Sequence, residues 1–369
     1  MLLGRFGAPD LRIFIPVLGF GKAGGYRVLS NFASEWKGLG HDVVFLCPRD
    51  YHNLYYPTTA QVEYLPTIYS NLPGFLRSKV LRDLFGLASL LLALLGRAGR
   101  DDVIVANRDL TAFPTRLAAL LKRSRGLYYV QAYEPEFYEF ENPLLRATAR
   151  AVSASTYSLN MLRIVNSPIY RNFKRLQSKH VAPPGIDLTT FHPKVTDGPA
   201  NDGCLTLGCI GRVEFWKGTK DVVEAVQSLR DQGLDLRLRM AFHLPQDFAH
   251  LDWVDLAQPH GDLNLAEFYR SCDFFIAAGK IQYGAFHYPA AESLAVGTTL
   301  VGSPYFPASP ANSYLFYECN AEAIAAALLR AIRDNEASRR ARVETGLRDV
   351  AGLSWGRAAA TFLEHLRSA

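Results

Sequence analysis

The feature that most constrains this chain is an alternation of strand-like and helical patterns that runs through it twice. The predicted strands of the first series are the short apolar runs at residues 11–18, 42–47, 102–106, 126–131 and 163–166. The predicted helices between them span residues 26–39, 80–95, 113–123, 142–160 and 170–176. Alternation of this kind predicts a parallel sheet covered by helices.

The pattern restarts after "HVAPPGIDLTTFHPKVTDGPANDG", residues 180–203, which is typical of a linker. The second series predicts strands at 204–210, 234–241, 272–277 and 298–301, and helices at 220–232, 265–270, 289–296, 321–335 and 355–368. A chain of 369 residues is too long for one ordinary core. We therefore predict two open α/β domains, residues 1–186 and 187–353, with the helix 354–369 packing back on the first. Ligands of such sheets bind at the carboxyl ends of the strands, and a cleft between the domains is the expected site.

A glycine-rich turn follows the first predicted strand. Gly19, Gly21 and Gly24 in "LGFGKAGG" complete a G-x-G-x-x-G pattern, which by itself suggests an NAD-dependent oxidoreductase. Such an enzyme needs an acidic residue at the end of the second strand to hold the ribose. The candidate is Asp50, about 26 residues past Gly24 and behind Pro48, which is poor placement. The oxidoreductase therefore stays a minor alternative.

Charge and cysteine usage narrow the class further. Residues 1–180 carry 23 Lys and Arg against 13 Asp and Glu, whereas residues 181–369 carry 17 against 22. The basic half suggests an anionic partner such as phosphates, anionic lipid or an acidic glycan, and no compact basic run points to nucleic acid. The five scattered cysteines are expected to be small buried thiols in a reducing compartment. We expect a cytoplasmic protein without a signal peptide, with the inner face of the membrane as an alternative location.

Three segments of the second half carry a family resemblance. They are "PPGIDLTTFHP" (residues 183–193), "LGCIGRVEFWKGTKDVVEAVQSL" (207–229) and "CDFFIAAGKIQYGAFHYPAAESLAVGTTLVGS" (272–303). In this order they resemble the motifs of retaining GT-B glycosyltransferases of the family 4 type, also called glycosyl transferases group 1. The opening glycines and the final "LSWGRAAATFLEHL" are similar to that family too. The resemblance implies two Rossmann-like domains facing each other across a cleft, the first binding the acceptor and the second a nucleotide-diphosphate sugar.

The same segments supply candidate donor-binding residues. Arg212 offers a planar fork of hydrogen-bond donors, and Lys217 offers a point charge. Both could stabilise the negative charge of a departing diphosphate. The alternative is that both are solvated surface charges. The resemblance implies that Glu292 accepts hydrogen bonds from the ribose hydroxyls, and its alternative role is a helix-dipole partner in a first turn. It also implies phosphate contacts from backbone N–H groups of two loops. These residues are Gly24 and Gly25 in the first domain and Gly284, Ala285, Phe286 and His287 in the second.

Two positions depart from the family pattern. Gly284 stands where the family usually has a glutamate that contacts the donor sugar, and Gln131 stands where a histidine is frequent. We treat Gln131 and His287 as further catalytic candidates, with a packed loop histidine as the alternative for His287. The run "VQAYEPEFY" is similar to a rhamnosyltransferase-like, polysaccharide-building branch. Acceptor candidates at the strand ends are Arg108, Asp109, Tyr133, Glu134 and Tyr138, with a helix cap or a solvated acidic and aromatic loop as alternatives.

These observations predict a retaining glycosyltransferase that moves a hexose or deoxyhexose onto a glycan or lipid-linked glycan in polysaccharide biosynthesis. The sequence contains no D-x-D pair, so we expect transfer without a metal or other cofactor, the two cations replacing the metal charge. The resemblance implies a front-face mechanism in which the leaving phosphate accepts the acceptor's proton. A catalytically inactive member that binds nucleotide sugar or glycan is the main alternative.

One further segment bears on partners. Residues 74–100, "GFLRSKVLRDLFGLASLLLALLGRAGR", combine about a dozen apolar residues with five flanking Lys and Arg. Such a segment could lie in a membrane interface near a lipid-linked acceptor. A core helix packed on the sheet is the alternative.

Overall fold

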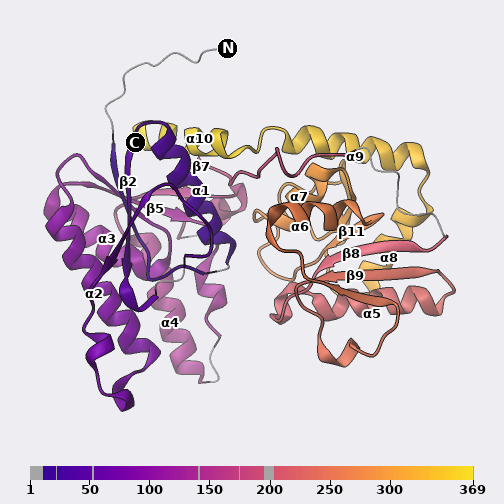
Figure 1. The fold of residues 1–369 in the computed structure, drawn as a ribbon, viewed down its shortest axis with the longest axis horizontal. Coiled ribbons are helices and arrows are strands. Elements are labelled where there is room, and N and C mark those ends of the chain that lie inside the picture. The colour runs from indigo at the N-terminus through magenta and orange to yellow at the C-terminus, as the bar shows by residue number, and fades with distance from the viewer. Residues whose placement is uncertain are drawn as a thin grey trace, which may run out of the picture. The chain divides into compact units, whose positions relative to one another are not determined.

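The computed structural model describes residues 11–21, 23–51, 54–139, 142–173, 175–194 and 203–368. Contacts divide the chain into two compact units, residues 1–183 with 355–369 and residues 184–354. Each unit contains one sheet, and every strand pairing in the described ranges is parallel (Figure 1). The prediction of two Rossmann-like α/β units is therefore confirmed.

Unit 1 has a seven-stranded sheet in the order β3-β2-β1-β4-β5-β6-β7. Its strands are β1 (Arg12–Pro16), β2 (Asp42–Pro48), β3 (Gln61–Leu65), β4 (Val103–Ala106), β5 (Arg125–Val130), β6 (Leu162–Val165) and β7 (His180–Val181). Its helices are α1 (Gly24–Gly38), α2 (Lys79–Arg97), α3 (Asp109–Lys122), α4 (Pro143–Ser155) and α10 (Trp355–Ser368). The chain order reverses between β1 and β4, so right-handed crossovers place α1 and α3 on opposite faces of the sheet.

The last helix of the chain belongs to unit 1 because aromatic side chains hold it there. Phe362 of α10 packs against Trp36 of α1, with ring centroids 4.8 Å apart, and against Tyr129 of β5 at 5.4 Å. The Trp36 Nε1–H donates to the carbonyl of Ala359 at 3.2 Å. These rings are fully buried, and aromatic burial of this kind dominates the energetics of a core.

A histidine pair joins the same helix to the edge of the sheet. The Nδ1 atoms of His180, in β7, and His365, in α10, lie 3.3 Å apart, and Nε2 of His365 lies 3.0 Å from the carbonyl of Val181. A carbonyl only accepts, so His365 carries its proton on Nε2 and its Nδ1 accepts from His180. The contact therefore requires a proton on Nδ1 of His180 and none on Nδ1 of His365.

We expect the protein to lose thermal stability as the pH falls from 7.5 to 5.5. Burial, with His365 beside it, lowers the pKa of His180 below its ordinary value, so the unfolded chain takes up the proton more readily. The contribution of His180 to the free energy of unfolding is complete above a pH of about 6.5, and it is lost as the pH falls below that value. Melting temperatures of the wild type and His365→Gln check this. An equally steep loss in the variant would show that other groups cause it.

Unit 2 has a six-stranded sheet in the order β10-β9-β8-β11-β12-β13. Its strands are β8 (Leu205–Ile210), β9 (Leu236–Ala241), β10 (Val254–Ala257), β11 (Phe274–Ala277), β12 (Thr299–Gly302) and β13 (Ser313–Leu315). Its helices are α5 (Thr219–Asp231), α6 (Gly261–Arg270), α7 (Tyr288–Val296), α8 (Ala321–Arg333) and α9 (Glu336–Val350).

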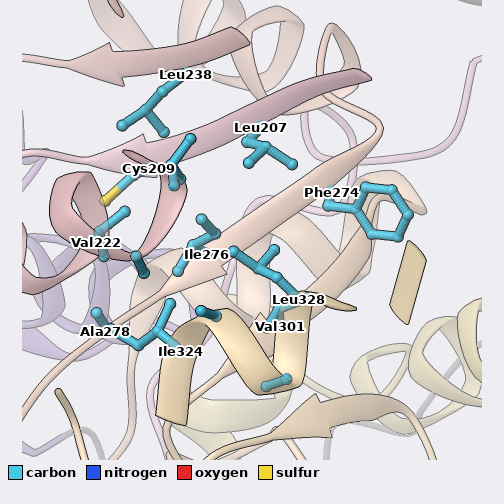
Figure 2. Packing of buried hydrophobic residues seen from close by; sticks show 14 of the residues in the cluster. Leu207, Cys209, Val222, Leu238, Phe274, Ile276, Ala278, Val301, Ile324 and Leu328 are labelled. Atoms are coloured by element: carbon cyan, nitrogen blue, oxygen red, sulfur yellow. The ribbon is translucent and has the colours of Figure 1, made fainter. Parts of the chain in front are cut away.

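Two apolar clusters hold the sheet of unit 2 between its helices. In one of them, Leu207, Ile276 and Val301 extend from neighbouring strands toward Val222 of α5 and Leu328 of α8 (Figure 2). The other cluster joins α6 and α7 to the sheet through Tyr269, Phe275 and Leu294. Both sheet faces are thus covered, which fixes the strand ends that carry the candidate site.

Several local predictions were wrong. A helix was expected at 170–176, but only a short 3-10 helix, Pro168–Asn172, forms there, because so few residues do not overcome the cost of helix nucleation. The strands β3, β10 and β13 and the helix α9 were not predicted. The region predicted as a linker contains β7, and its residues 195–202 lie outside the described part of the chain.

The expectation of small buried thiols is confirmed for four of the five cysteines, and none of the five forms a disulfide. Burial raises the pKa of Cys47, Cys209 and Cys272 to about 12, so these thiols stay protonated and unreactive at neutral pH. Within the described ranges, no helix has the length and apolar character needed to cross a bilayer.

Candidate functional site

The candidate donor site of unit 2 lies where the strand order reverses. β8 is the first strand of the unit, and it lies between β9 and β11, so the loops that follow β8 and β11 leave the sheet in opposite directions. A crevice at the carboxyl ends of such strands is the usual ligand site of an open parallel sheet. The two loops contact each other, since the backbone N–H of Lys280 donates to the carbonyl of Trp216 at 2.8 Å.

Two glycines shape the loop after β8. A Cβ atom on Gly211 would lie 1.7 Å from the carbonyl oxygen of His243, so only glycine fits there. Gly218 has a φ of +69° and begins α5, and its Cβ position is 2.5 Å from Sγ of Cys319. Thr219 closes the loop: its hydroxyl accepts from the N–H of Arg212 and donates to the carbonyl of Arg212, both at 2.9 Å.

This closed loop carries the two predicted cations. Arg212 is exposed, and its guanidinium lies 5.7 Å from the ring centroid of Phe242. Lys217 is half-buried, and burial followed by repulsion from Arg212 lowers the pKa of its ammonium. No ion pair within the described residues neutralises either cation through a contact of 4.0 Å or less. The loop therefore presents two positive charges that repel each other, a field that suits an anion with more than one charge.

His287 belongs to the same electrostatic group. Its ring stacks on Tyr305 with centroids 4.7 Å apart, and its Nδ1 is buried with no hydrogen-bond partner in the described structure. Burial, then Lys217 and Arg212, lowers the pKa of His287 to about 3. The ring is therefore neutral at physiological pH and can offer a hydrogen bond to a ligand, but not a charge.

The backbone of the loop from Gly284 to His287 differs from the expectation. Its N–H groups were expected to face a phosphate, but three of them donate within the unit: Gly284 to Pro304 at 2.7 Å, Ala285 to Gln282 at 3.0 Å and His287 to Phe306 at 3.0 Å. The reason is a parallel bridge between Phe286 and Phe306 that pairs this loop with the one after β12. A backbone contact to a phosphate there would depend on the N–H group of Phe286 or on the N–H groups in the first turn of α7.

Glu292 lies in the second turn of α7, not in the first. The carboxylate is only 1% exposed, and one of its oxygens accepts from the hydroxyl of Tyr269 at 2.9 Å. Its position makes the alternative role, a helix-dipole partner in a first turn, incorrect. A buried carboxylate held by a buried tyrosine is oriented, and the resemblance assigns such a group to the ribose hydroxyls.

We expect Glu292→Gln to raise the KM for the sugar donor about ten- to a hundredfold while the melting temperature stays nearly unchanged. The amide oxygen can still accept from Tyr269, but the charge-assisted hydrogen bonds to a ribose are lost, and each is worth about 1.5–3 kcal/mol. Steady-state kinetics and thermal unfolding measure the two effects. A lower melting temperature with an unchanged KM would give Glu292 a structural role only.

In unit 1, the structure brings Gln131 and Gly25 together. Gly24 and Gly25 are the first residues of α1, where backbone N–H groups lack partners within the helix. Gln131 follows β5, and its Nε2 donates to the carbonyl of Gly25 at 3.2 Å. The predicted phosphate-facing glycines and the predicted donor-sugar contact are thus neighbours at the carboxyl edge of this sheet.

The acceptor candidates of unit 1 form a half-buried network around Asp109, which is fully buried. Tyr138 donates to Asp109 at 2.7 Å, and Tyr128 donates to Glu134. Burial, then the charge of Asp109, raises the pKa of Glu134 to about 8, so this carboxyl is protonated at neutral pH. Arg108 lies 3.7 Å from Asp109. The alternative of a solvated acidic loop is therefore incorrect for these residues.

Two candidates have limited freedom to meet an acceptor. Both carboxylate oxygens of Asp109 are engaged, by the N–H of Leu110 at 2.7 Å and by Tyr138. Asp109 is the first residue of α3, and the cap position is Arg108. Tyr133 stacks on Phe173 with ring centroids 4.4 Å apart, so one face of its ring is covered.

Sequence reasoning missed the residues that hold the candidates in place. Tyr305 supports His287, Thr219 closes the cationic loop, and Tyr269 orients Glu292. Only Thr219 had a local signal, since it follows the Lys-Gly pair directly at a helix start. The tyrosines come from segments distant in sequence, and only the fold brings them to the site.

Comparison with known proteins agrees with this geometry. The family model described as glycosyl transferases group 1 matches residues 204–334, which contain Arg212, Lys217, His287 and Glu292. A comparison with curated protein sequences gives no match. The family match covers about a third of the chain and supports the glycosyltransferase class.

Solved structures similar to the whole chain are GT-B glycosyltransferases. Sucrose-phosphate synthase from Thermosynechococcus elongatus has a TM-score of 0.74 at 17% identity, covering 97% of this chain and 99% of that one. HepE from Anabaena, in complex with UDP and glucose, has a TM-score of 0.71 at 15% identity, covering 98% and 100%. The catalytic domain of starch synthase IV from Arabidopsis thaliana, bound to ADP and acarbose, has a TM-score of 0.69 at 15% identity, covering 98% and 99%. These similarities show that the chain has the GT-B fold.

Proposed function

We propose that this protein is a retaining glycosyltransferase that uses a nucleotide-diphosphate sugar and acts without a metal ion. The transferred group is a hexose or deoxyhexose, with rhamnose as one candidate, and the acceptor is a glycan or lipid-linked glycan in polysaccharide biosynthesis. The fold, the family match over residues 204–334 and the nucleotides bound by similar structures support the donor class.

One observation carries the proposal: Arg212 and Lys217 share a closed loop at the strand-order reversal of unit 2, and no close ion pair in the described structure neutralises them. When the bond between sugar and phosphate breaks, negative charge grows on the diphosphate. Two fixed cations stabilise that charge more in the transition state than in the ground state, which is the condition for catalysis. They would supply the positive charge that a metal ion supplies in other transferases.

The remaining candidates fit the same substrate. Neutral His287 would donate or accept one hydrogen bond at the donor, and Glu292 would hold the ribose. In a front-face mechanism, the acceptor hydroxyl attacks the anomeric carbon as the bond to the diphosphate breaks, and the hydroxyl proton passes to the departing phosphate oxygen. That mechanism needs no basic side chain, and Glu134, which is protonated at neutral pH, does not have to provide one.

The oxidoreductase alternative has no support in the structure. Asp50 was the only candidate for its ribose contact, and its carboxylate accepts a hydrogen bond from Thr67 within unit 1. The family match and the similar solved structures are glycosyltransferases.

A panel of UDP-, GDP-, ADP- and TDP-sugars tests the proposal. We expect one donor to raise the melting temperature and to be hydrolysed slowly in the presence of EDTA. Binding without hydrolysis, even with oligosaccharide acceptors added, would favour a catalytically inactive member. The proposal would be contradicted if no sugar nucleotide were bound or hydrolysed. Hydrolysis that EDTA abolishes would contradict its metal-independent part.

A further inference from the structure

The outer face of helix α2 is apolar, although it faces solvent. Its inner face packs against β2 and β3 through buried residues that include Leu90 and Leu94. On the opposite side Val80, Leu84 and Leu92 recur at multiples of four residues, and all three are exposed. A surface helix of a globular protein normally carries polar residues on that side. The core alternative for this segment is therefore correct for the inner face of α2, and its other face is apolar and exposed.

The same surface continues beyond α2. Beside the helix is a groove of about 360 Å³, lined by mainly apolar residues that include Ile68, Phe85 and Leu92. Phe75, just before α2, is 87% exposed. The neighbouring helix α3, which packs on α2, exposes Phe113, Leu117, Leu120 and Leu121. Exposed apolar residues gathered on two helices that pack on each other are typical of an interaction site.

Charge indicates the kind of partner. The helices α2 and α3 carry five Lys and Arg residues and two Asp residues. Asp109, one of the two, is buried, and Arg97 is paired with Glu63, which leaves four basic residues against Asp83. An apolar face beside an excess of positive charge is complementary to an anionic lipid surface. A second copy of the chain fits less well, because a two-fold contact would bring like charges together.

We propose that the outer faces of α2 and α3, which we call the α2–α3 face, bind an anionic membrane surface. Phe75, Val80, Leu84 and Leu92 enter the headgroup boundary, and the basic residues of the same helices contact lipid phosphates. The protein would lie on the membrane, since no helix in the described ranges can span it. The inference does not rest on the proposed transfer reaction, although a surface of this kind would bring the enzyme to a lipid-linked acceptor.

Co-sedimentation of the full chain with vesicles tests the inference. We expect binding to phosphatidylglycerol vesicles and much weaker binding to pure phosphatidylcholine vesicles. The double variant Leu84→Gln/Leu92→Gln should lower the partition coefficient at least about tenfold, because two apolar side chains no longer leave water. Arg116→Gln/Lys122→Gln should lower the partition coefficient about twenty-five-fold, because each charge near the surface contributes roughly fivefold.

Leu263→Gln is the matched control. Leu263 lies on α6 of unit 2 and, like Leu92, is 70% exposed, so its replacement should leave vesicle binding unchanged. If the double variant does not fold, Phe75→Ser replaces it, since Phe75 lies outside the long helices. Three outcomes would overturn the inference: no vesicle binding, equal binding to neutral vesicles, or a dimer in solution that the double variant dissociates. Loss of vesicle binding with donor hydrolysis intact would leave the proposed function standing.

Discussion

Replacing Lys217 with Met is expected to lower the rate of donor hydrolysis about a hundred- to a thousandfold. Methionine keeps most of the length and apolar volume of the lysine side chain but removes its charge. A single group that stabilises developing negative charge typically contributes this much to kcat. Arg212→Ala should cause a loss of similar size. The assay is release of nucleotide diphosphate from the best donor of the panel, in EDTA.

Lys220→Met is the control for this prediction. Lys220 lies three residues further on, at the start of α5, and its ammonium lies 3.6 Å from Glu224 on the exposed side of the helix. The control should keep nearly full activity. Equal losses in Lys217→Met and Lys220→Met would indicate a general effect of charge on the unit, and full activity of Lys217→Met would remove the central support of the proposed function.

Gly211→Ala is expected to destabilise the protein by about 3 kcal/mol or more. The added Cβ would lie 1.7 Å from the carbonyl oxygen of His243 and 3.2 Å from the terminal methyl of Met240. The first of these is a backbone atom that cannot rotate away, so β8 and the loop after β9 must separate. Overpacking of this kind usually costs about 1–3 kcal/mol, and a clash with backbone lies at the upper end. Chemical denaturation measures the change.

Gly38→Ala provides the comparison. Gly38 is the last residue of α1, and a Cβ there would meet no atom within 4 Å. At a helical position alanine is more favourable than glycine by up to about 1 kcal/mol. This variant should therefore be as stable as the wild type or slightly more stable. If Gly211→Ala proved as harmless as Gly38→Ala, the close backbone approach after β8 would not exist in solution.

The two predicted cations illustrate how much of the candidate site the sequence could indicate. The sequence could predict that Arg212 and Lys217 lie in one loop, because a short loop between a strand and a helix keeps its residues close together in any fold. The sequence could not predict that Tyr305 contacts His287 or that Tyr269 contacts Glu292. These contacts span 18 and 23 residues and depend on how two loops or two helices pack.

The missed elements follow the same principle. α9 has almost no apolar face, and only Gly346 and Val350 are buried, so helical periodicity gave no signal. β3 reads "QVEYL" and lies at the edge of its sheet, where only its last residue is fully buried. Both elements are stabilised by their neighbours more than by their own pattern.

By itself, the sequence determined the parallel α/β class, the restart of the pattern and the motif residues of unit 2, because periodicity and glycine placement are local properties of the chain. The tertiary structure decided which groups are charged and where they lie. Burial beside Arg212 and Lys217 makes His287 neutral, burial beside Asp109 makes Glu134 an acid that holds its proton, and packing of α2 on the sheet leaves an apolar face outward. Desolvation depends on atoms supplied by distant segments, so no local pattern in the sequence could show it.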